Sequence, residues 1–363
     1  MTKRIEWIDI AKGIAILFVI VGHSLGAYGG GFITNVIFAF HMPIFFILSG
    51  YLYHPKNVNK NIKDGTFNLL FPYLFTSLLI LIVSMFALKI KNFSVLNPFY
   101  TSIKQATISI IYGAGSVPVN PFHFAIKQVG ALWFLIAMFF SIQIFNIIMK
   151  LTYSIPNNFI KRLLCFSMIS ALGTFLTNVF VLPFSLNAAF LSTLFLFVGY
   201  CIRQYDVLNA ITLPYVLILL VFWLATSKKN FFLFMTASST NIYISVITAI
   251  FASICVIKFC IALQNNSKFQ ITNRILTWYG KNSLAILCFH LLDMNALLIT
   301  NHVYAMPISP LAHTIILTIY RIIIASFLTL LVSKVPFIRS FYFHRKFSFF
   351  SFRTKYKKKQ EKN

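Results

Sequence analysis

Apolar residues along the chain are grouped into long runs that are separated by short polar breaks. An α-helix needs about 20 such residues to cross a hydrocarbon core about 30 Å thick. Ten runs have roughly this length, namely 10–28, 33–53, 69–88, 130–149, 163–182, 187–203, 208–226, 241–263, 279–299 and 311–332. Because a bilayer core offers no water to an unpaired backbone, runs of this kind form helices. The pattern therefore predicts an all-α fold, a polytopic transmembrane bundle of about ten helices.

Lysine and arginine are distributed unevenly among the polar breaks. If the N-terminus is inside, the breaks at 29–32, 183–186 and 300–310 face outward, and they contain neither residue. The inner breaks contain Lys56, Lys60, Lys63, Lys150, Lys161, Arg162, Arg203, Lys268 and Arg274. This is the excess of basic residues expected on the cytoplasmic side, although Lys228 and Lys229 fall outside. With an even number of spans, both termini are predicted to be cytoplasmic.

The chain is predicted to contain one membrane domain and a basic end. Residues 1–335 form the ten-helix domain, 89–129 form a long outer loop within it, and 336–363 form a basic cytoplasmic tail. The first apolar run follows a basic pair, as in a signal peptide, but acidic residues interrupt that basic region. We therefore expect a retained first helix.

The composition agrees with a membrane protein. Of the residues, 59% are hydrophobic and 10% are charged, whereas a soluble domain has about 25% charged residues. The formal charge is +25, and ten of the 31 basic residues lie between Lys334 and Lys362. We interpret the terminal cluster from Lys355 to Lys362 as an anchor near anionic lipid headgroups. No nucleic-acid partner is expected.

Ionisable residues inside a predicted span are costly, so each is a candidate functional residue. They are Lys12, His23, His41, His290, Asp293 and Arg321, with Asp9 at the edge of the first span.

The first span presents three of these residues on one face. Lys12 and His23 are eleven residues apart, which on a helix is about 20° from perfect alignment. Asp9 falls within about 40° of His23, and His23 lies roughly 16 Å deeper than Lys12. A cation at the entrance and an imidazole deep inside suit a ligand that is anionic at one end and reactive at the other, as acyl-CoA is. Alternatively, Lys12 extends to the interface and His23 is a structural histidine.

The second and the last two predicted spans contain further candidates. Pro43 follows His41 and is expected to break the second helix, while Gly50 permits close approach of another helix. For His41, a structural hydrogen bond and a role in the site both remain open. His290 and Asp293 are helical neighbours. Asp293 and Arg321 are predicted at comparable depth and are expected to form an ion pair, which has either a structural or a catalytic role.

Four motifs in order resemble the integral-membrane acyltransferase-3 family. The first is Trp7-Ile8-Asp9-Ile10-Ala11-Lys12-Gly13 followed by Gly22-His23-Ser24, and the second is His41-Met42-Pro43 through Phe45-Phe46 to Ser49-Gly50-Tyr51. The third is Leu132-Trp133-Phe134-Leu135, and the fourth is Tyr279-Gly280-Lys281-Asn282-Ser283-Leu284, ending at His290. The resemblance covers about residues 3–335.

The resemblance implies a multi-pass O-acyltransferase, usually an acetyltransferase, that takes cytoplasmic acyl-CoA and modifies surface glycans or lipid-linked precursors. It implies that His23 is the essential residue and Lys12 its basic partner. Members of the family commonly carry arginines before the Pro-Tyr of the third helix, but Thr66-Phe67-Asn68-Leu69 stands here, so Lys60 and Lys63 are expected to substitute in binding CoA. The plasma (inner) membrane is the expected location.

Three further expectations concern the site. Trp133 is interpreted as part of the aromatic belt at the outer interface, with sugar stacking as the alternative, and Ser283 is expected either to line the site or to have a structural role. The five cysteines show no Cys-x-x-Cys spacing, so neither a disulfide framework nor a metal is expected. The alternative functions are export of a polysaccharide or lipid-linked intermediate, and structural support of an envelope-synthesis complex.

Overall fold

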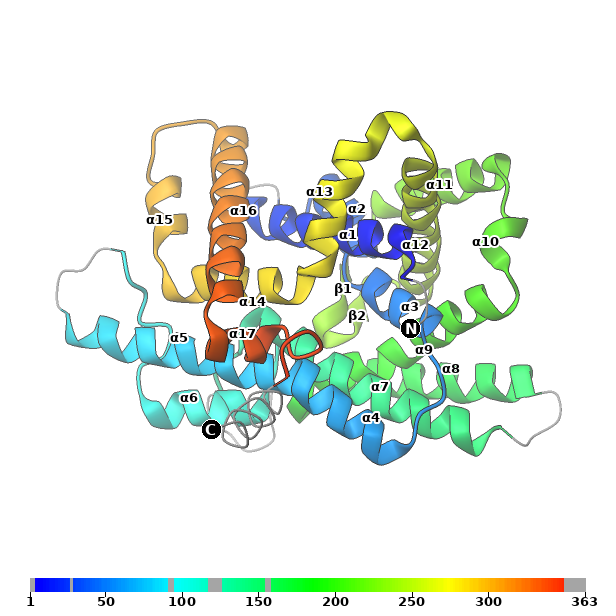
Figure 1. Ribbon diagram of the computed structural model, residues 1–363, viewed down its shortest axis with the longest axis horizontal. Coiled ribbons are helices and arrows are strands. Elements are labelled where there is room, and N and C mark those ends of the chain that lie inside the picture. Colours follow the sequence, from blue (N-terminus) through cyan, green and yellow to red (C-terminus); the bar gives the residue numbers. More distant parts are fainter. Residues whose placement is uncertain (1–3, 27–28, 91–94, 117–125, 154–157, 349–363) are drawn as a thin grey trace, which may run out of the picture.

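The computed structural model describes residues 4–26, 29–90, 95–116, 126–153 and 158–348, and they are mostly helical (Figure 1). The first half of the chain forms α1 (Glu6–Ser24), α2 (Phe32–Phe40), α3 (Pro43–Tyr51), α4 (Val58–Gly65), the π-helix η2 (Thr66–Leu70), α5 (Phe71–Lys89), α6 (Ile103–Tyr112), the 3-10 helix η3 (Gly130–Leu132), α7 (Trp133–Leu151) and α8 (Asn158–Thr177). The second half forms η4 (Pro183–Ser185), α9 (Leu186–Gln204), α10 (Val207–Ala210), α11 (Leu213–Ser227), β1 (Phe232–Leu233), η5 (Phe234–Thr236), β2 (Ser238–Ser239), α12 (Ile242–Asn265), η6 (Ser267–Phe269), α13 (Gln270–Lys281), α14 (Ser283–Ala296), α15 (Ile299–Tyr304), α16 (Pro310–Lys334) and α17 (Pro336–Tyr342).

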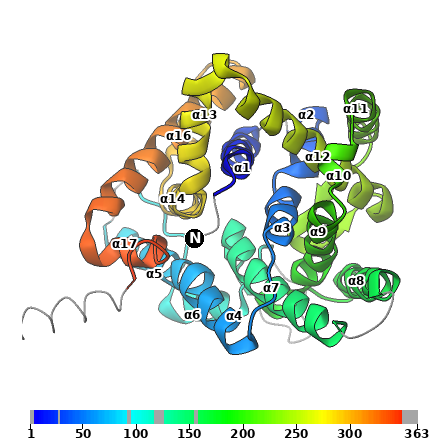
Figure 2. The same ribbon diagram turned by 45° about the vertical axis from the view of Figure 1, so that its right-hand side comes forward.

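Each of the ten predicted apolar runs contains a helix. Within the described part of the chain, eight helical stretches are long and apolar enough to cross a membrane, and α11 and α14 are shorter apolar helices. The all-α, polytopic prediction is therefore confirmed. In Figure 2, α1, α8, α9, α11 and α14 are seen nearly end-on, while α12 and α16 cross the view obliquely.

Two of the predicted runs are divided between two helices for local reasons, and only the first division was not predicted. The ninth predicted run begins at Tyr279, but Tyr279 belongs to α13, which ends at Lys281, and α14 begins only at Ser283. The second run is broken as expected, because α2 ends at Phe40 and α3 begins at Pro43, whose ring cannot continue a helix without losing a backbone hydrogen bond.

Glycines bring two pairs of helices into close contact. A methyl group at Gly13 of α1 would overlap the backbone of Leu276 in α13, and one at Gly280 of α13 would overlap the backbone of Asp9. In the same way, Gly50 of α3 lies against Leu196 of α9. Small residues at such crossings let helix backbones approach closely in a membrane. The predicted role of Gly50 is confirmed.

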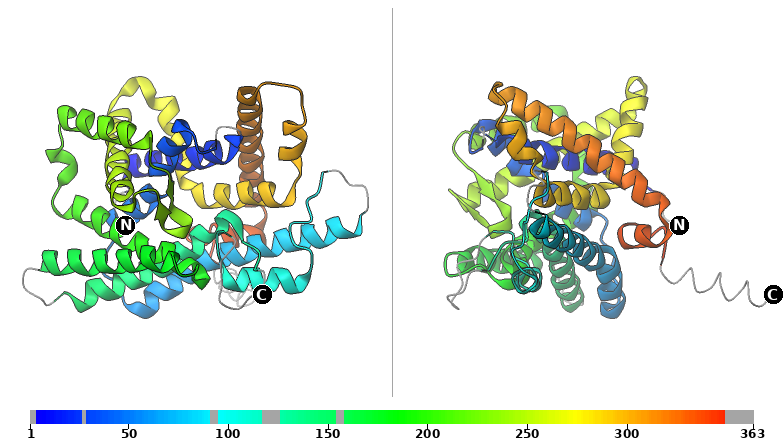
Figure 3. Two further views of the ribbon diagram at one scale, coloured as in Figure 1. Left: turned by 180° about the vertical axis from the view of Figure 1, so that it is seen from behind. Right: turned by 90° about the vertical axis from the view of Figure 1, so that its left-hand side faces the viewer.

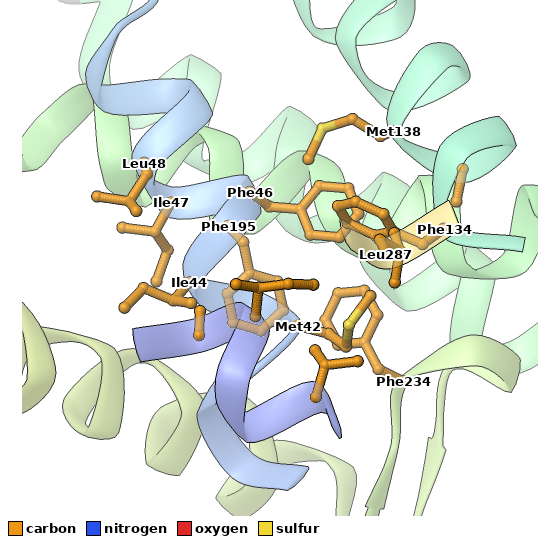
Figure 4. Close-up of a cluster of buried hydrophobic side chains, with 14 of the residues drawn as sticks. Met42, Ile44, Phe46, Ile47, Leu48, Phe134, Met138, Phe195, Phe234 and Leu287 are labelled. Atoms are coloured by element: carbon orange, nitrogen blue, oxygen red, sulfur yellow. The ribbon is translucent and has the colours of Figure 1, made fainter. Parts of the chain in front are cut away.

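Large aromatic and aliphatic side chains fill the space between the helices. Figure 4 shows Phe46 of α3 close to Phe134 of α7 and Phe234 of η5. The ring centroids are 5.4 Å apart in both pairs, a separation at which aromatic rings attract one another. This core fixes α3 and α7 against each other and supports one side of the site described below.

The described part of the predicted outer loop is attached to the bundle. It contains α6, and its first part pairs with the end of α14 through Asn97 N to Ala296 O at 2.8 Å and Leu298 N to Val95 O at 2.8 Å. Residues 117–125 of this loop, with two of its prolines, lie outside the described residues.

The predicted basic tail begins with a packed segment. After α16 the chain forms α17, which lies against α5, and Tyr342 is buried there (Figure 3). Residues 336–348 therefore belong to the folded bundle. The cluster from Lys355 to Lys362 lies outside the described residues, so its role as a lipid anchor remains a prediction.

Candidate functional site

One face of α1 forms a wall of the site. Lys12, Ile16, Val19 and His23 follow one another at helical spacing, so their side chains project from the same side of α1. A cavity of about 60 Å³ lies against this face, and its lining residues are Ile16, Val19, Met42, Phe45, Phe134, Ser283, Leu284 and Leu287. They come from α1, α3 and the residue preceding it, α7 and α14. These helices surround one region in Figure 2. The cavity is thus located between the level of Lys12 and that of His23.

His23 is held by a second histidine from a distant part of the chain. Its Nδ1 lies 3.0 Å from Nε2 of His290 in α14. His290 is fully buried, whereas His23 is half-buried. If Nδ1 of His23 carries the proton and donates a hydrogen bond to Nε2 of His290, then Nε2 of His23 keeps a free lone pair. In this tautomer His23 can accept a proton from a substrate.

Arg321 of α16 holds the end of α1 that carries His23. Its Nη1 donates to the backbone carbonyl of His23 at 2.7 Å and to Ser24 Oγ at 2.9 Å, and its Nη2 donates to Thr300 Oγ1 at 2.8 Å. The last carbonyls of a helix have no partner within it, and a cation there is favoured by the helix dipole. Arg321 therefore fixes the last turn of α1 and with it the position of His23.

The predicted ion pair between Asp293 and Arg321 is present. Arg321 Nε lies 3.7 Å from Asp293 Oδ2, and Asp293 Oδ1 accepts a hydrogen bond from Tyr320 at 2.8 Å. The side chain of Arg321 is 2% exposed. A charge buried so deeply needs such partners, because an unpaired one would cost several kcal/mol. Of the two predicted roles for the pair, this geometry favours a structural one that positions α1.

The start of α1 carries charges of both signs, with Glu6 and Asp9 in its first turn and Lys12 in the next. Asp9 is buried and forms a two-pronged pair with Arg4, with Nε to Oδ2 at 2.5 Å and Nη2 to Oδ1 at 3.0 Å. This hydrogen bonding raises the pKa of Arg4 above its usual value. Lys12 lies one turn further on, half-buried, within electrostatic range of Asp9, Arg4 and Arg345. The position of Lys12 at the opposite end of the face from His23 agrees with the spacing argument.

Lys60 and Lys63 lie outside the lining of the cavity. Both lie on α4 and are exposed to solvent. On the same helix, Asp64 pairs with Lys56 at 2.9 Å. The structure does not bring Lys60 or Lys63 into the lining of the cavity, and their expected role in binding CoA remains a prediction.

His41 has a structural partner. Its Nδ1 is 2.8 Å from the carbonyl oxygen of Ile37, and the ring packs edge-on against Phe38 with centroids 4.7 Å apart. This hydrogen bond satisfies a buried polar atom at the break between α2 and α3. The geometry favours the structural alternative for His41.

Trp133 does not face the lipid interface. Its side chain is 4% exposed, and its ring stacks on Phe234 with centroids 6.0 Å apart. The interpretation as part of an aromatic belt is therefore wrong, because the first residue of α7 points inward at the helix end. Ser283, in contrast, lines the cavity as expected, at the start of α14.

Sequence reasoning missed several polar partners of the site. Ser24 and Thr300 accept hydrogen bonds from Arg321, and Tyr320 contacts Asp293. Hydroxyl residues are common in membrane helices, so they gave no signal by themselves. The buried Arg321 was the available signal, since five N–H donors in a fixed fork require several acceptors nearby.

A metal-binding cluster is not found in the part of the chain that the structure describes. No group of three or more His, Cys, Asp or Glu residues is arranged there to hold a metal ion. The five cysteines are free thiols.

The comparison with protein families gives a match over nearly the whole chain. The family model described as an acyltransferase domain, of the acyltransferase-3 type, matches residues 5–333. The comparisons with curated proteins and with solved structures gave no match. The matched range includes the α1 face, both histidines of the hydrogen-bonded pair and the buried Arg321. The chain therefore belongs to the acyltransferase-3 family, and it is a multi-pass membrane acyltransferase.

Proposed function

We propose that the protein transfers an acyl group, most simply acetyl, from cytoplasmic acyl-CoA to a hydroxyl group of a glycan or a lipid-linked saccharide. The main support is the α1 face, which carries Lys12 near its start, Ile16 and Val19 in the wall of a mostly apolar cavity, and the imidazole of His23, beside His290, at its far end. Acyl-CoA has matching parts in the same order, namely phosphates, a long thin arm and a thioester. Membrane lipids surround the enzyme, and the plasma (inner) membrane is its proposed location.

His23 acts as the general base in this proposal. The acceptor oxygen attacks the thioester carbonyl while Nε2 of His23 removes the hydroxyl proton. The tetrahedral intermediate then collapses, the carbon–sulfur bond breaks, and protonated His23 returns the proton to the departing sulfur. The products are the acyl ester and free CoA, and His23 is neutral again. A general base at the right distance contributes about 10²- to 10⁴-fold to the rate.

The apolar lining serves the same step by excluding water. Seven of the eight residues around the cavity are hydrophobic, and Ser283 is the exception. A dry site protects the thioester from hydrolysis and strengthens the hydrogen bonds that orient the reacting groups. We place the acyl end of the donor in this cavity and the acceptor hydroxyl on the His23 side.

The test compares wild type with His23→Ala in cells and in purified membranes. Wild type should add one acyl group to a surface glycan or its lipid-linked precursor, detected by mass spectrometry, and His23→Ala should abolish that product while remaining correctly inserted. His54→Ala is the matched control, since His54 is an exposed histidine, and it should retain activity.

Two results would count against the proposal. Full acylation by His23→Ala would remove this histidine from the chemistry. If acylation is unaffected by deletion of the protein and a lipid-linked intermediate accumulates inside the cell instead, the protein is an exporter.

A further inference from the structure

The end of α1 that carries His23 is in contact with α15 and with the first turns of α16. The guanidinium of Arg321 donates to the backbone carbonyl of His23 at 2.7 Å and also to Thr300 Oγ1 of α15 at 2.8 Å. Thr314 Oγ1 of α16 donates to the backbone carbonyl of Leu25 at 3.5 Å. Figure 1 shows α15 beside α16, against which the end of α1 also packs. The residues on either side of His23 are therefore held by these two helices.

Tyr304, the last residue of α15, contacts the chain three residues after His23. A methyl group at Gly26 would overlap the hydroxyl of Tyr304, and Gly26 has a φ of +48°, so this position needs glycine on both counts. The hydroxyl end of the tyrosine is thus held at the end of α1, while 40% of the residue stays exposed. Its ring meets that of His313 edge-on, with centroids 5.5 Å apart. The exposed ring is therefore fixed in place between the end of α1 and α16.

His313 offers a hydrogen-bond acceptor beside this ring. Its Nε2 lies 3.1 Å from the carbonyl oxygen of Met306. Because a carbonyl oxygen only accepts, Nε2 carries the proton, and Nδ1 of the neutral ring keeps its lone pair. Asn301 of α15 is exposed and lies three residues before Tyr304, so the two side chains are helical neighbours. An aromatic ring, an imidazole acceptor and an amide are thus gathered at one place.

The segment that carries these side chains is polar but uncharged. No Asp, Glu, Lys or Arg occurs between residues 294 and 320, and the flanking Asp293 and Arg321 are paired with each other. The segment therefore offers an anionic ligand no charged partner. A saccharide is neutral, and it presents C–H groups on the face of its ring and hydroxyl groups around the edge. It matches an exposed aromatic ring with neutral hydrogen-bonding groups beside it.

We infer that Tyr304, His313 and Asn301 bind the sugar of the acceptor and present its hydroxyl group to His23 at the end of α1. This inference rests on the proposed function and specifies where the second substrate binds. The ring of Tyr304 stacks on the sugar, Nδ1 of His313 accepts a hydrogen bond from one sugar hydroxyl, and the amide of Asn301 bonds to another. The donor cavity lies on the Lys12 side of His23, so the two substrates reach this histidine from opposite ends of the α1 face.

The experiment measures saccharide binding and acetyl transfer by the full chain in nanodiscs. The probe is the unacylated saccharide extracted from cells that lack the protein, with acetyl-CoA as the donor. Tyr304→Ala should weaken saccharide binding and raise the KM for the saccharide about tenfold, while the KM for acetyl-CoA stays unchanged. Tyr304→Phe keeps the ring and should bind the saccharide nearly as wild type does. His313→Ala should raise the KM for the saccharide about three- to tenfold, as expected for one lost hydrogen bond.

His302→Ala is the matched control for His313→Ala. His302 is exposed on α15, and its Nδ1 bonds to the backbone carbonyl of Leu298 at 2.9 Å, much as His313 bonds to that of Met306. Its spacing of two residues from Tyr304, however, places it on nearly the opposite side of the helix. His302→Ala should therefore bind and acylate the saccharide as wild type does.

The outcomes distinguish this inference from the proposed function. If Tyr304→Ala and His313→Ala bind and acylate the saccharide like wild type, the inference is wrong, the proposed function stands, and Tyr304 belongs to an interfacial aromatic belt. An equal loss in His302→Ala would mean a general disturbance of α15 and would also contradict the inference. If wild type binds the saccharide through Tyr304 but transfers no acetyl group to it, the proposed function is wrong and the saccharide site stands without it. If wild type neither binds nor acylates the saccharide, both are wrong.

Discussion

The guanidinium of Arg321 in α16 donates a 2.7 Å hydrogen bond to the backbone carbonyl of His23, the last residue but one of α1. A buried cation thus binds the last turn of the helix that carries the proposed base. The same guanidinium pairs with Asp293 three residues after His290. Arg321 therefore positions both histidines. It binds the backbone carbonyl of His23 directly, and it holds α14, the helix of His290, through Asp293.

This relationship predicts that Arg321 has two separable effects. Arg321→Met should lower the free energy of unfolding by about 3–5 kcal/mol, because Asp293 is left buried and unpaired. It should also lower kcat, because the last turn of α1 is no longer held. Thermal unfolding in detergent and acyl transfer by the purified protein measure the two effects.

The double variant Arg321→Met with Asp293→Asn tests the separation. Removing both charges should recover part of the stability, since a neutral pair avoids the unpaired charge, but kcat should remain low. If activity returns together with stability, then Arg321 does not position His23 and acts only through the ion pair.

A second prediction concerns the contact between the two histidines. His290→Phe should fill the same space without accepting a hydrogen bond, so that the tautomer of His23 is no longer fixed. We expect kcat to fall by about a hundredfold, with little change in the KM for acyl-CoA. His290→Gln keeps a hydrogen-bonding amide and should retain more activity than His290→Phe. Equal activity of all three proteins would mean that His290 has no orienting role.

The α1 face and the ion pair could be predicted from the sequence because each depends on local rules. The eleven-residue spacing of Lys12 and His23 fixes their common face on any helix, and the cost of burying Asp293 or Arg321 alone demands a partner. The contact of His23 with His290 could not be predicted, because it requires knowing that α1 adjoins α14. Spacing along the chain contains no such information.

Two other features could not be predicted from the sequence, for different physical reasons. Trp133 was misplaced because an aromatic residue at a helix end can point toward lipid or toward the core, and only packing against Phe234 decides. The segment after residue 335 is predicted to be a solvent-exposed tail because it is rich in lysine and arginine. Its contacts, however, are made by Phe341 and Tyr342, whose aromatic rings are buried or half-buried against α5.

The third prediction concerns the length of the acyl chain. Leu287→Ala removes part of the cavity wall, so donors with longer chains should become better substrates. Two extra methylenes buried in the new space are worth about 1.6 kcal/mol, so the ratio of kcat/KM for butyryl to that for acetyl donor should rise about tenfold. Leu291→Ala is the control, because Leu291 is buried one turn further along α14 and does not line the cavity. An equal rise in both variants would show that general loosening, and not the cavity, sets chain length.

The fourth prediction tests whether the close contact of α1 with α13 supports the site. A methyl group at Gly13 would overlap the backbone carbonyl of Leu276, and a backbone cannot move aside as a side chain can. Gly13→Ala should therefore lower the free energy of unfolding by about 1–3 kcal/mol, even though alanine is the better helix former. The shift of α1 away from α13 should also displace Lys12, so the KM for acyl-CoA should rise.

Gly22→Ala on the same helix provides the matched comparison for stability. The added methyl there would lie 3.2 Å from the ring of Phe38 and 3.4 Å from a side-chain methyl of Ile37, and both neighbours can adjust. The gain from replacing a glycine inside a helix, about 0.5–1 kcal/mol, should then offset most of the strain, leaving the unfolding temperature nearly unchanged. If both variants are destabilised equally, the effect reflects lost helix flexibility. If only Gly13→Ala is destabilised, backbone contact between α1 and α13 is what holds α1, and with it Lys12 and His23, in place.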